Sequence, residues 1–145
     1  MTESIAILRA GPADLKLARE SVAELHGRTP SDDALADFLS DPASYLLVAV
    51  AGHRIVGSLN GFALQPPHRR KPQFLLYEID VRVESRNQGI GTALVARFIA
   101  EARAAGAFEV WVMTNESNAA AMAMYGSCGL RREHRDDVML SLILT

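Results

Sequence analysis

The stretch SRNQGIGTAL, residues 85–94, places two glycines and an arginine between a strand pattern and a helix pattern. Glycine lets the backbone approach a ligand closely, and the start of a helix adds a partial positive charge. Arg86 and Thr92 supply a cation and a hydroxyl group at the same turn. The stretch therefore predicts an anion-binding turn, and the alternative is a strand-to-helix turn that merely requires glycine.

Two common phosphate-binding motifs do not fit this turn. A dinucleotide-binding turn requires a third glycine where this sequence has Leu94, and an acidic residue at the end of the next strand, which is missing. A Walker-type loop requires a lysine directly after its last glycine, and neither Gly89 nor Gly91 is followed by one. The remaining pattern is R-x-x-G-x-G, from Arg86 to Gly91, at the start of a helix.

Apolar spacing along the rest of the chain alternates between strand and helix periods. Strands are expected at 5–10, on both sides of a turn at 52–53, at 74–83, at 108–113 and finally at 137–144. Helices are expected from residue 12, after residue 31, at 89–105 and at 117–128. This order predicts one α/β domain over residues 1–145, with a mixed central sheet and helices on both faces.

Composition restricts the class of protein. With 49% hydrophobic residues, 22% charged residues and a net charge of −2, the chain has the composition of an ordinary globular protein and not of a nucleic-acid binder. No signal-peptide pattern opens the sequence, and its longest apolar run, residues 45–51, is too short to cross a bilayer. We therefore expect a cytoplasmic protein without a membrane segment, and no metal site is indicated.

Two further features have a plain structural interpretation. The basic cluster HRRK at residues 68–71 lies between prolines, which predicts a solvated loop. Its alternative role is a lip that contacts coenzyme phosphates or a partner chain. The single cysteine, Cys128, excludes an internal disulfide, and it is interpreted as a buried structural thiol and not as an acyl-carrying nucleophile.

Residues 83–107 and 115–130 resemble the acetyl-CoA-binding core of the GNAT superfamily of N-acetyltransferases. The matching positions are Arg86, Gly89 and Gly91 in the first family motif, and Asn118, Ala121, Tyr125, Gly129 and Leu130 in the second. The resemblance implies the GNAT fold, in which two strands splay apart at the acetyl-CoA site. It also implies that the backbone of residues 88–92 binds the coenzyme pyrophosphate and that the pantetheine arm lies beside residues 79–83. The acetyl-CoA site implied in this way comprises Ile79, Asp80, Val81, Val83, Arg86, Asn87, Gln88, Gly89, Ile90, Gly91, Thr92, Asn118 and Tyr125.

Glu78 is the candidate general base for acetyl transfer to an amine. Its carboxylate lies in an otherwise apolar strand, and Asp80 projects from the same face two residues later. Two carboxylates this close repel each other, which favours a proton-accepting role, whereas the alternative is a pair of edge-strand charges facing water. The resemblance adds Tyr125 as the general acid at the coenzyme sulfur, with a core tyrosine as the alternative. It also adds the backbone N–H of Val81 as the donor to the acetyl carbonyl.

Four segments resemble the aminoglycoside 3-N-acetyltransferases more specifically. They are LYEIDV at 76–81, RNQGIGTALV at 86–95, GAFEVWV at 106–112 and REHRDDVM at 132–139. The resemblance departs at Asp80, where a small apolar residue is expected. A polycationic amine requires converging carboxylates, and the implied substrate site comprises Tyr77, Glu78, Asp80, Glu116, Asp136 and Asp137. Without the resemblance, the pair at 136–137 is interpreted as a solvated turn.

These features predict acetyl transfer from acetyl-CoA to an aminoglycoside amine, at the 3-amino group, by direct attack with a carboxylate base, which would confer antibiotic resistance. One alternative is an acetyltransferase of another amine, such as a polyamine or a protein amino terminus. A second alternative is a non-catalytic acyl-CoA-binding sensor, although loss of Glu78 or Tyr125 would be expected there and both are present. The expected partner is the polycationic substrate, and a homodimer is the assembly considered.

Overall fold

The computed structural model describes residues 3–145, whose strands form a five-stranded sheet in the order β1-β2-β3-β4-β5. The strands are β1 (Ile5–Arg9), β2 (Ser44–Ala51), β3 (Arg54–Leu64), β4 (Gln73–Val81) and β5 (Glu109–Val112). The helices are α1 (Leu15–His26), α2 (Asp32–Ser40), α3 (Ile90–Ala104) and α4 (Ala119–Ser127), with short 3-10 helices at Pro12–Asp14 and Val83–Ser85. Neighbouring strands are antiparallel, apart from the parallel pair β4 and β5.

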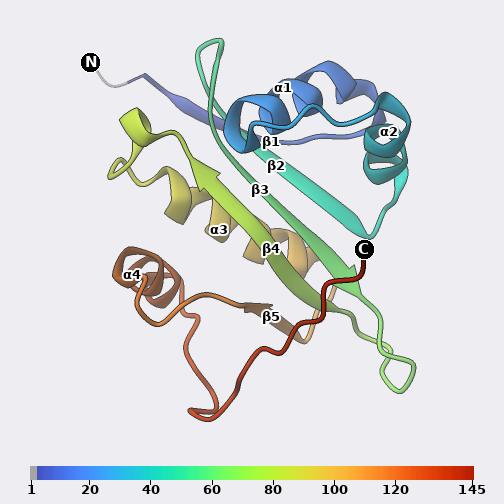
Figure 1. The fold of residues 1–145 in the computed structure, drawn as a ribbon, viewed down its shortest axis with the longest axis vertical. Helices are drawn as coiled ribbons and strands as arrows, with labels where there is room; N and C mark the ends of the chain where they lie inside the picture. The colour runs from blue at the N-terminus through green and yellow to red at the C-terminus, as the bar shows by residue number, and fades with distance from the viewer. Residues whose placement is uncertain (1–2) are drawn as a thin grey trace.

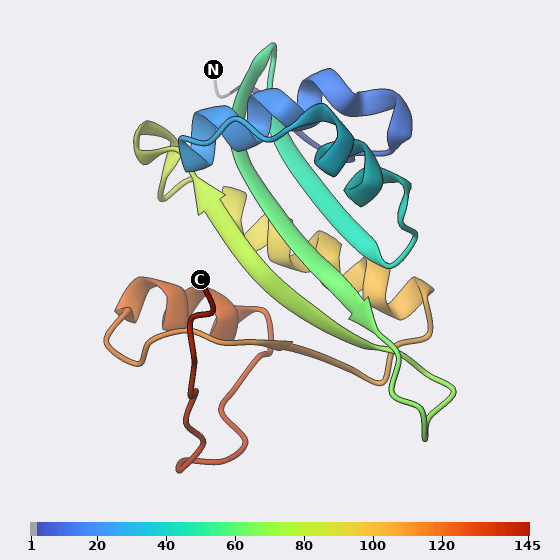
Figure 2. The same cartoon turned by 45° about the vertical axis from the view of Figure 1, so that its right-hand side comes forward.

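Helices cover both faces of the sheet (Figures 1 and 2). Helices α1 and α2 pack over β2 and β3 on one face, and α3 lies along the other face. The core under α3 is the larger one, and Leu47, Phe74 and Phe98 are fully buried in it. A second core around Leu39 and Val48 lies under α1 and α2. The predicted mixed α/β fold with helices on both faces is confirmed.

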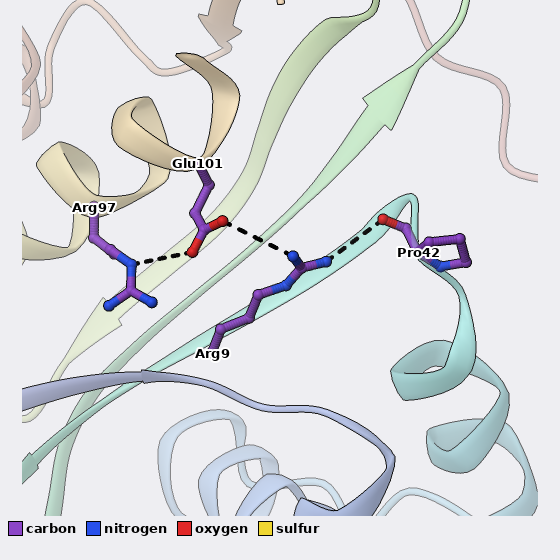
Figure 3. Close-up of polar contacts among 4 residues, drawn as sticks. All are labelled: Arg9, Pro42, Arg97 and Glu101. Atoms are coloured by element: carbon purple, nitrogen blue, oxygen red, sulfur yellow. Dashed lines mark hydrogen bonds and ion pairs between the residues drawn. The ribbon is translucent and has the colours of Figure 1, made fainter. Parts of the chain in front are cut away.

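Glu101 fastens α3 to the β1 side of the sheet (Figure 3). Its carboxylate accepts a hydrogen bond from Nε of Arg97 at 3.1 Å and pairs with Nη1 of Arg9 at 3.8 Å. Arg9 also donates to the carbonyl oxygen of Pro42 at 3.5 Å. Arg97 donates to the carbonyl oxygen of Ile7 at 3.1 Å. Because the Glu101 side chain is only 19% exposed, these charged contacts are less screened than surface pairs, and they orient α3 across the sheet.

Strand β4 continues beyond the end of its neighbour β5. Their paired residues run from Gln73 with Glu109 to Leu76 with Val112, whereas β4 itself extends to Val81. The outer edge of residues 77–81 is therefore not paired by β5. The pairing of the two strands ends at this point, where the resemblance to the GNAT superfamily implies that they splay apart.

A β-bulge at Tyr77 reverses the alternation of side chains along β4. The ladder with β3 shifts register between Asn60 and Gly61, which leaves Tyr77 as the extra residue. Leu76 packs into the core under α3 before the bulge, and Ile79 does so after it. The acidic side chains of this strand consequently face the opposite side of the sheet, where α1 lies.

The strand predicted at 137–144 is wrong for the chain as described. Residues 131–145 contain no helix or strand, and Figures 1 and 2 show the chain after α4 swinging out in a long loop. A strand forms only when a neighbouring edge pairs with its N–H and C=O groups, and an apolar composition alone does not supply that edge. The strand predicted at 74–83 also ends earlier, at Val81, because the backbone turns there into a 3-10 helix.

Candidate active site

The turn before α3 leaves the N-terminus of this helix open. Asn87 and Gly89 adopt left-handed backbone angles, with φ of 61° and 79°, and α3 begins at Ile90. Ser31 and Asn118 cap α2 and α4 with their side-chain oxygens, whereas the N-cap of α3 is a glycine and has no side chain to do so. The first N–H groups of α3 thus remain available to an anion, which the helix dipole also favours.

Most residues predicted to contact acetyl-CoA follow one path from the end of β4 to the first turn of α3. Ile79 and Val81 lie near the end of the strand and are half-buried. The residues exposed along the rest of this path are Val83, Arg86, Asn87, Gln88, Gly89 and Thr92. Ile90 is an exception, since its side chain is buried in the core under α3. The path is therefore open to a long ligand that follows the backbone.

The backbone of Val81 faces the gap between β4 and β5. The N–H of Arg82 donates to the carbonyl oxygen of Val56 at 2.9 Å, and inward and outward groups alternate along an antiparallel ladder. The N–H and C=O groups of Val81 consequently point away from β3. Nε of Arg86 confirms this direction, because it donates to the carbonyl oxygen of Val81 at 3.2 Å. The N–H of Val81 is thus oriented toward the space in which an acetyl group is expected.

Gly91 allows α4 to lie against the first turn of α3. A Cβ atom at Gly91 would come within 2.6 Å of Sδ of Met124, so a larger residue does not fit without a shift. In the same contact, Sγ of Cys128 lies 3.9 Å from the carbonyl oxygen of Thr92. Because Met124 directly precedes Tyr125, this contact joins the helix of the predicted acid to the predicted anion site. The Cys128 side chain is half-buried there and not fully buried as predicted, and its packing against the core agrees with a structural role.

Tyr125 is buried on α4, with 7% of its surface exposed. Burial raises the pKa of its hydroxyl above the ordinary value of 10.0, because the charged phenolate would be poorly solvated there. The hydroxyl therefore keeps its proton at neutral pH and remains a potential donor. The side chain also packs into the core under α3, so a structural and a catalytic role are compatible.

His26 joins the two carboxylates of β4 into one cluster. Nδ1 of His26 lies 3.2 Å from Oδ2 of Asp80, and Nε2 lies 3.9 Å from Oε2 of Glu78. The histidine side chain is 23% exposed, against 50% for Glu78 and 41% for Asp80. Both carboxylates thus project from the same face, as predicted, but toward an imidazole as well as toward water. The orientation of Asp80 favours its predicted substrate role over a role in coenzyme binding.

Asn60 adds a further polar group beside this cluster. It pairs directly with Glu78 across the β3–β4 ladder. Its Oδ1 atom is buried and has no hydrogen-bond partner within the described part of the chain. A buried amide oxygen without a donor is costly. Because this oxygen is shielded from solvent, Asn60 is a polar group beneath the cluster and not an exposed contact for a ligand.

Neither His26 nor Asn60 was identified from the sequence. His26 is the last residue of α1 and precedes Gly27, which ends the helix with φ of 66°. A histidine at the end of an amphipathic helix is a weak signal, because the strand that it meets is distant in the sequence. Asn60 lies in a strand of mostly buried residues, and a polar side chain in such a strand is the one feature that could have pointed to it.

The other predicted substrate residues divide into two groups. Tyr77 is 60% exposed beside Glu78 and contacts Phe62 edge-on, with ring centroids 5.7 Å apart. Glu116 lies elsewhere and forms an ion pair with Arg132 at 3.5 Å. The acidic pair at 136–137 is exposed in the loop after α4, which extends away from the end of β4 in Figures 1 and 2. Within residues 3–145, the fold does not bring this pair to Glu78.

The basic cluster at 68–71 is a solvated loop, as predicted. All four residues are exposed in the connection between β3 and β4, and the Arg69 guanidinium lies over the Phe108 ring at 4.3 Å. This loop precedes Gln73, at the start of β4, whereas the glycine turn follows the end of the same strand. The position of the loop does not support a lip over the coenzyme phosphates.

The described residues provide neither a metal centre nor a membrane-spanning helix. No cluster of three His, Cys, Asp or Glu side chains within residues 3–145 is arranged to hold a metal ion. None of the helices in that range has both the length and the apolar character needed to cross a bilayer.

Residues 15–130 match the family described as the acetyltransferase (GNAT) family. N-acetyltransferase 8B from Homo sapiens is 31% identical over 105 residues, which cover 72% of this chain and 46% of that protein. N-acetyltransferase 8 from Rattus norvegicus is 31% identical over 104 residues, which cover 72% of this chain and 47% of that protein. The chain thus spans about half the length of the curated relatives it matches.

Solved acetyltransferases share the fold over almost the whole chain. An aminoglycoside acetyltransferase from an uncultured soil metagenomic sample, in complex with trehalose, has a TM-score of 0.82 and 25% identity, covering 97% of both chains. A sisomicin complex of such an enzyme has a TM-score of 0.82 and 24% identity over the same coverage. An aminoglycoside N-acetyltransferase in complex with CoA has a TM-score of 0.76 at 18% identity, covering 97% of both chains.

Proposed function

The chain belongs to the acetyltransferase (GNAT) family, and from this membership we propose that it transfers an acetyl group from acetyl-CoA to the 3-amino group of an aminoglycoside. The observation that carries the choice of acceptor is the cluster of Glu78, Asp80 and His26, which lies on the sheet face beside the end of α1 and keeps both carboxylates half-exposed. An aminoglycoside is a polycation, and two half-exposed carboxylates attract it without a strongly acidic protein surface.

The chain's own residues fit acetyl-CoA at the glycine turn. The open N-terminus of α3 and the left-handed Gly89 suit the coenzyme pyrophosphate, with Arg86 as a nearby cation. The gap beside residues 77–81 suits the pantetheine arm, because β4 presents unpaired backbone groups there. When bound, the coenzyme supplies an acetyl group activated as a thioester.

The reaction requires three events that these residues can carry out. Glu78 takes a proton from the acceptor ammonium group, which produces a nucleophilic amine. The N–H of Val81 donates a hydrogen bond to the carbonyl oxygen as negative charge develops on it. Tyr125 donates its hydroxyl proton to the leaving sulfur and regains a proton from the second one that the attacking nitrogen loses as the amide forms. Its burial favours the protonated hydroxyl at neutral pH.

Asn118 has a structural role that limits its part in binding. Its Oδ1 atom accepts a hydrogen bond from the N–H of Ala121 at 3.1 Å and so caps α4. We assign contact with the pantetheine arm to its amide NH₂ group, which the cap does not use. Asn118 would then fix the position of the pantetheine arm relative to the start of α4.

The aminoglycoside acceptor is supported by solved relatives of the same fold, one of them in complex with sisomicin. The curated relatives are named N-acetyltransferase 8 and 8B, and those names specify no acceptor. A second candidate function is therefore acetylation of another amine, such as a polyamine or a protein amino terminus. The half-exposed carboxylates of Glu78 and Asp80 would also attract those cations.

The test is a thiol-release assay with acetyl-CoA against a panel of aminoglycosides, polyamines and peptides. We expect thiol release with aminoglycosides and a product acetylated at the 3-amino group, located by NMR. Expression in a susceptible bacterium should then raise the inhibitory concentration of the same drugs. Thiol release with polyamines or peptides but with no aminoglycoside would contradict the aminoglycoside proposal and support acetylation of another amine. Binding of acetyl-CoA without turnover of any amine would indicate a sensor.

A further inference from the structure

The bulge in β4 turns Tyr77 and Glu78 toward the same face of the sheet. Glu78 lies beside His26 at the end of α1 on that face. The Tyr77 ring contacts Phe62 of β3, and Phe62 in turn contacts Phe38 of α2, which lies on the same face as α1 (Figures 1 and 2). A large aromatic side chain is thus the direct neighbour of the candidate base.

Phe38, Phe62 and Tyr77 form a row of three rings that runs from α2 across β3 to β4. The ring centroids of Phe38 and Phe62 are 5.8 Å apart, those of Phe62 and Tyr77 are 5.7 Å apart, and the planes of each pair meet at 78°. Edge-on contacts of this kind stabilise a ring pair beyond the area that they bury. Phe38 packs against the core around Leu39 and Val48, so the row connects Tyr77 to a buried part of the protein.

The Tyr77 ring keeps an open surface despite this support. The residue is 60% exposed, and an edge-on neighbour covers at most one face of a ring. Because Phe62 restricts the rotation of the ring, a ligand that lies on it loses less conformational entropy than it would on a mobile side chain. Tyr77 is therefore a flat, preorganised apolar surface, and the half-exposed carboxylate of Glu78 lies at its border.

We propose that Tyr77 stacks against a ring of the acceptor, that Phe62 and Phe38 position it for this role, and that the row of rings selects cyclic polyamines over linear ones. An amino sugar or aminocyclitol ring has an apolar face of C–H groups and carries its amino groups at the rim. Such a ring can cover Tyr77 while Glu78 reaches one of the amines. A linear polyamine presents ammonium groups but no ring face. The inference rests on the proposed function, since Glu78 is the base there.

Two constants measure this selectivity: the KM for an aminoglycoside, and the inhibition constant of spermidine, a linear polyamine that competes for the same carboxylates. Tyr77→Ala should raise the aminoglycoside KM about fivefold to tenfold and leave the spermidine constant unchanged. Tyr77→Phe should keep the wild-type KM, because it retains the ring. Leu8→Ala is the matched control, since Leu8 is an exposed apolar residue on β1, and it should change neither constant. An equal loss for spermidine would indicate a cation–π contact and overturn the selection of rings.

A double-mutant cycle tests the positioning role of Phe62. Phe62→Leu keeps an apolar side chain at this half-buried position but removes the edge-on contact with Tyr77. It should raise the aminoglycoside KM about threefold and leave kcat unchanged. In the Tyr77→Ala background the same substitution should have no further effect, because it acts through the Tyr77 ring. Additive effects of the two substitutions on KM would overturn the positioning role.

Calorimetry separates this inference from the proposed function, because it measures binding without acetyl transfer. The wild type and Tyr77→Ala are each titrated with the aminoglycoside, and the wild type should bind it about fivefold more tightly. This difference in Kd, in a wild type that turns over no amine, would contradict the proposed function and still support the stacking surface. Equal Kd values for the two proteins would overturn the stacking surface, whether or not the wild type acetylates the drug.

Discussion

Nδ1 of His26 lies 3.2 Å from Oδ2 of Asp80, although the two residues come from the end of α1 and the end of β4. An ion pair between Glu24 and Arg82 holds the same helix end to the residue that follows β4. Arg82 is itself fixed by the hydrogen bond that its Nε donates to the carbonyl oxygen of Ile55 at 2.5 Å. These contacts anchor the end of α1 beside the candidate base Glu78, so that His26 lies next to its carboxylate.

We predict that His26 positions Glu78 and Asp80. His26→Ala should lower kcat about tenfold to a hundredfold, because small displacements of a base are costly, and should leave the KM for acetyl-CoA unchanged. His26→Asn should retain more activity, since its amide nitrogen can replace Nδ1 beside Asp80. The measurement is the pH profile of kcat for both variants, which should differ in shape from that of the wild type.

His53 provides the matched control for this experiment, because it is an exposed histidine at the turn between β2 and β3. His53→Asn should keep the wild-type pH profile. An identical profile for His26→Ala and the wild type would remove His26 from the site.

Tyr125 should make stability depend on pH in the alkaline range. Burial raises the pKa of its hydroxyl in the folded state, so folding favours the protonated form. This contribution is fully present below the ordinary pKa of about 10 and is lost as the pH rises through the folded-state pKa. The free energy of unfolding of the wild type should therefore fall as the pH rises above about 10. The free energy of unfolding of Tyr125→Phe should fall less over the same range.

Denaturant unfolding at a series of alkaline pH values measures this difference. Tyr77→Phe is the control, because Tyr77 is 60% exposed, and its unfolding curve should follow that of the wild type. Parallel curves for Tyr125→Phe and the wild type would show that burial of this hydroxyl does not govern the alkaline response.

Gly91 is predicted to be required for packing as well as for ligand approach. Gly91→Ala should destabilise the protein by about 1–3 kcal/mol, because the new methyl group meets Sδ of Met124 at 2.6 Å. Met124→Ala should relieve much of this cost, so that the double variant is less destabilised than the sum of the two single variants. Chemical denaturation of the four proteins measures the coupling.

Gly126→Ala is the control for this cycle. Gly126 also lies in the α3–α4 region, but a Cβ atom at that position would meet nothing within 4 Å. Alanine there should leave stability unchanged or raise it, since glycine is unfavourable inside a helix. Strict additivity between Gly91→Ala and Met124→Ala would show that the close contact is not what requires glycine.

The helices and strands up to α4 were predicted from the sequence because the apolar spacing within each segment indicates its type. Apolar spacing predicted the helix at 89–105, and Leu94, Phe98 and Ala102 of α3 are all buried. The projection of Glu78 and Asp80 from one face also followed from strand alternation, since the bulge at Tyr77 precedes both residues. These features depend on neighbours in the sequence and not on distant contacts.

Long-range contacts could not be predicted in the same way. The last strand, expected at 137–144, depends on an edge that its own apolar pattern does not identify. The contact between His26 and Asp80 joins residues far apart in the sequence, and the helix signal before Gly27 says nothing about which strand it meets. The orphaned Oδ1 of Asn60 likewise becomes visible only when β3 lies beside β4.

Whether Glu78 is the base for acetylation of an aminoglycoside is decided by comparing two proteins, the wild type and Glu78→Gln. The measurement is kcat for thiol release from acetyl-CoA with an aminoglycoside, in the wild type and in Glu78→Gln, together with the Kd for acetyl-CoA. We predict steady release by the wild type, a loss of about 10²-fold or more in the variant, and an unchanged Kd. Equal turnover by the two proteins, or no release by the wild type with any aminoglycoside, would contradict the claim.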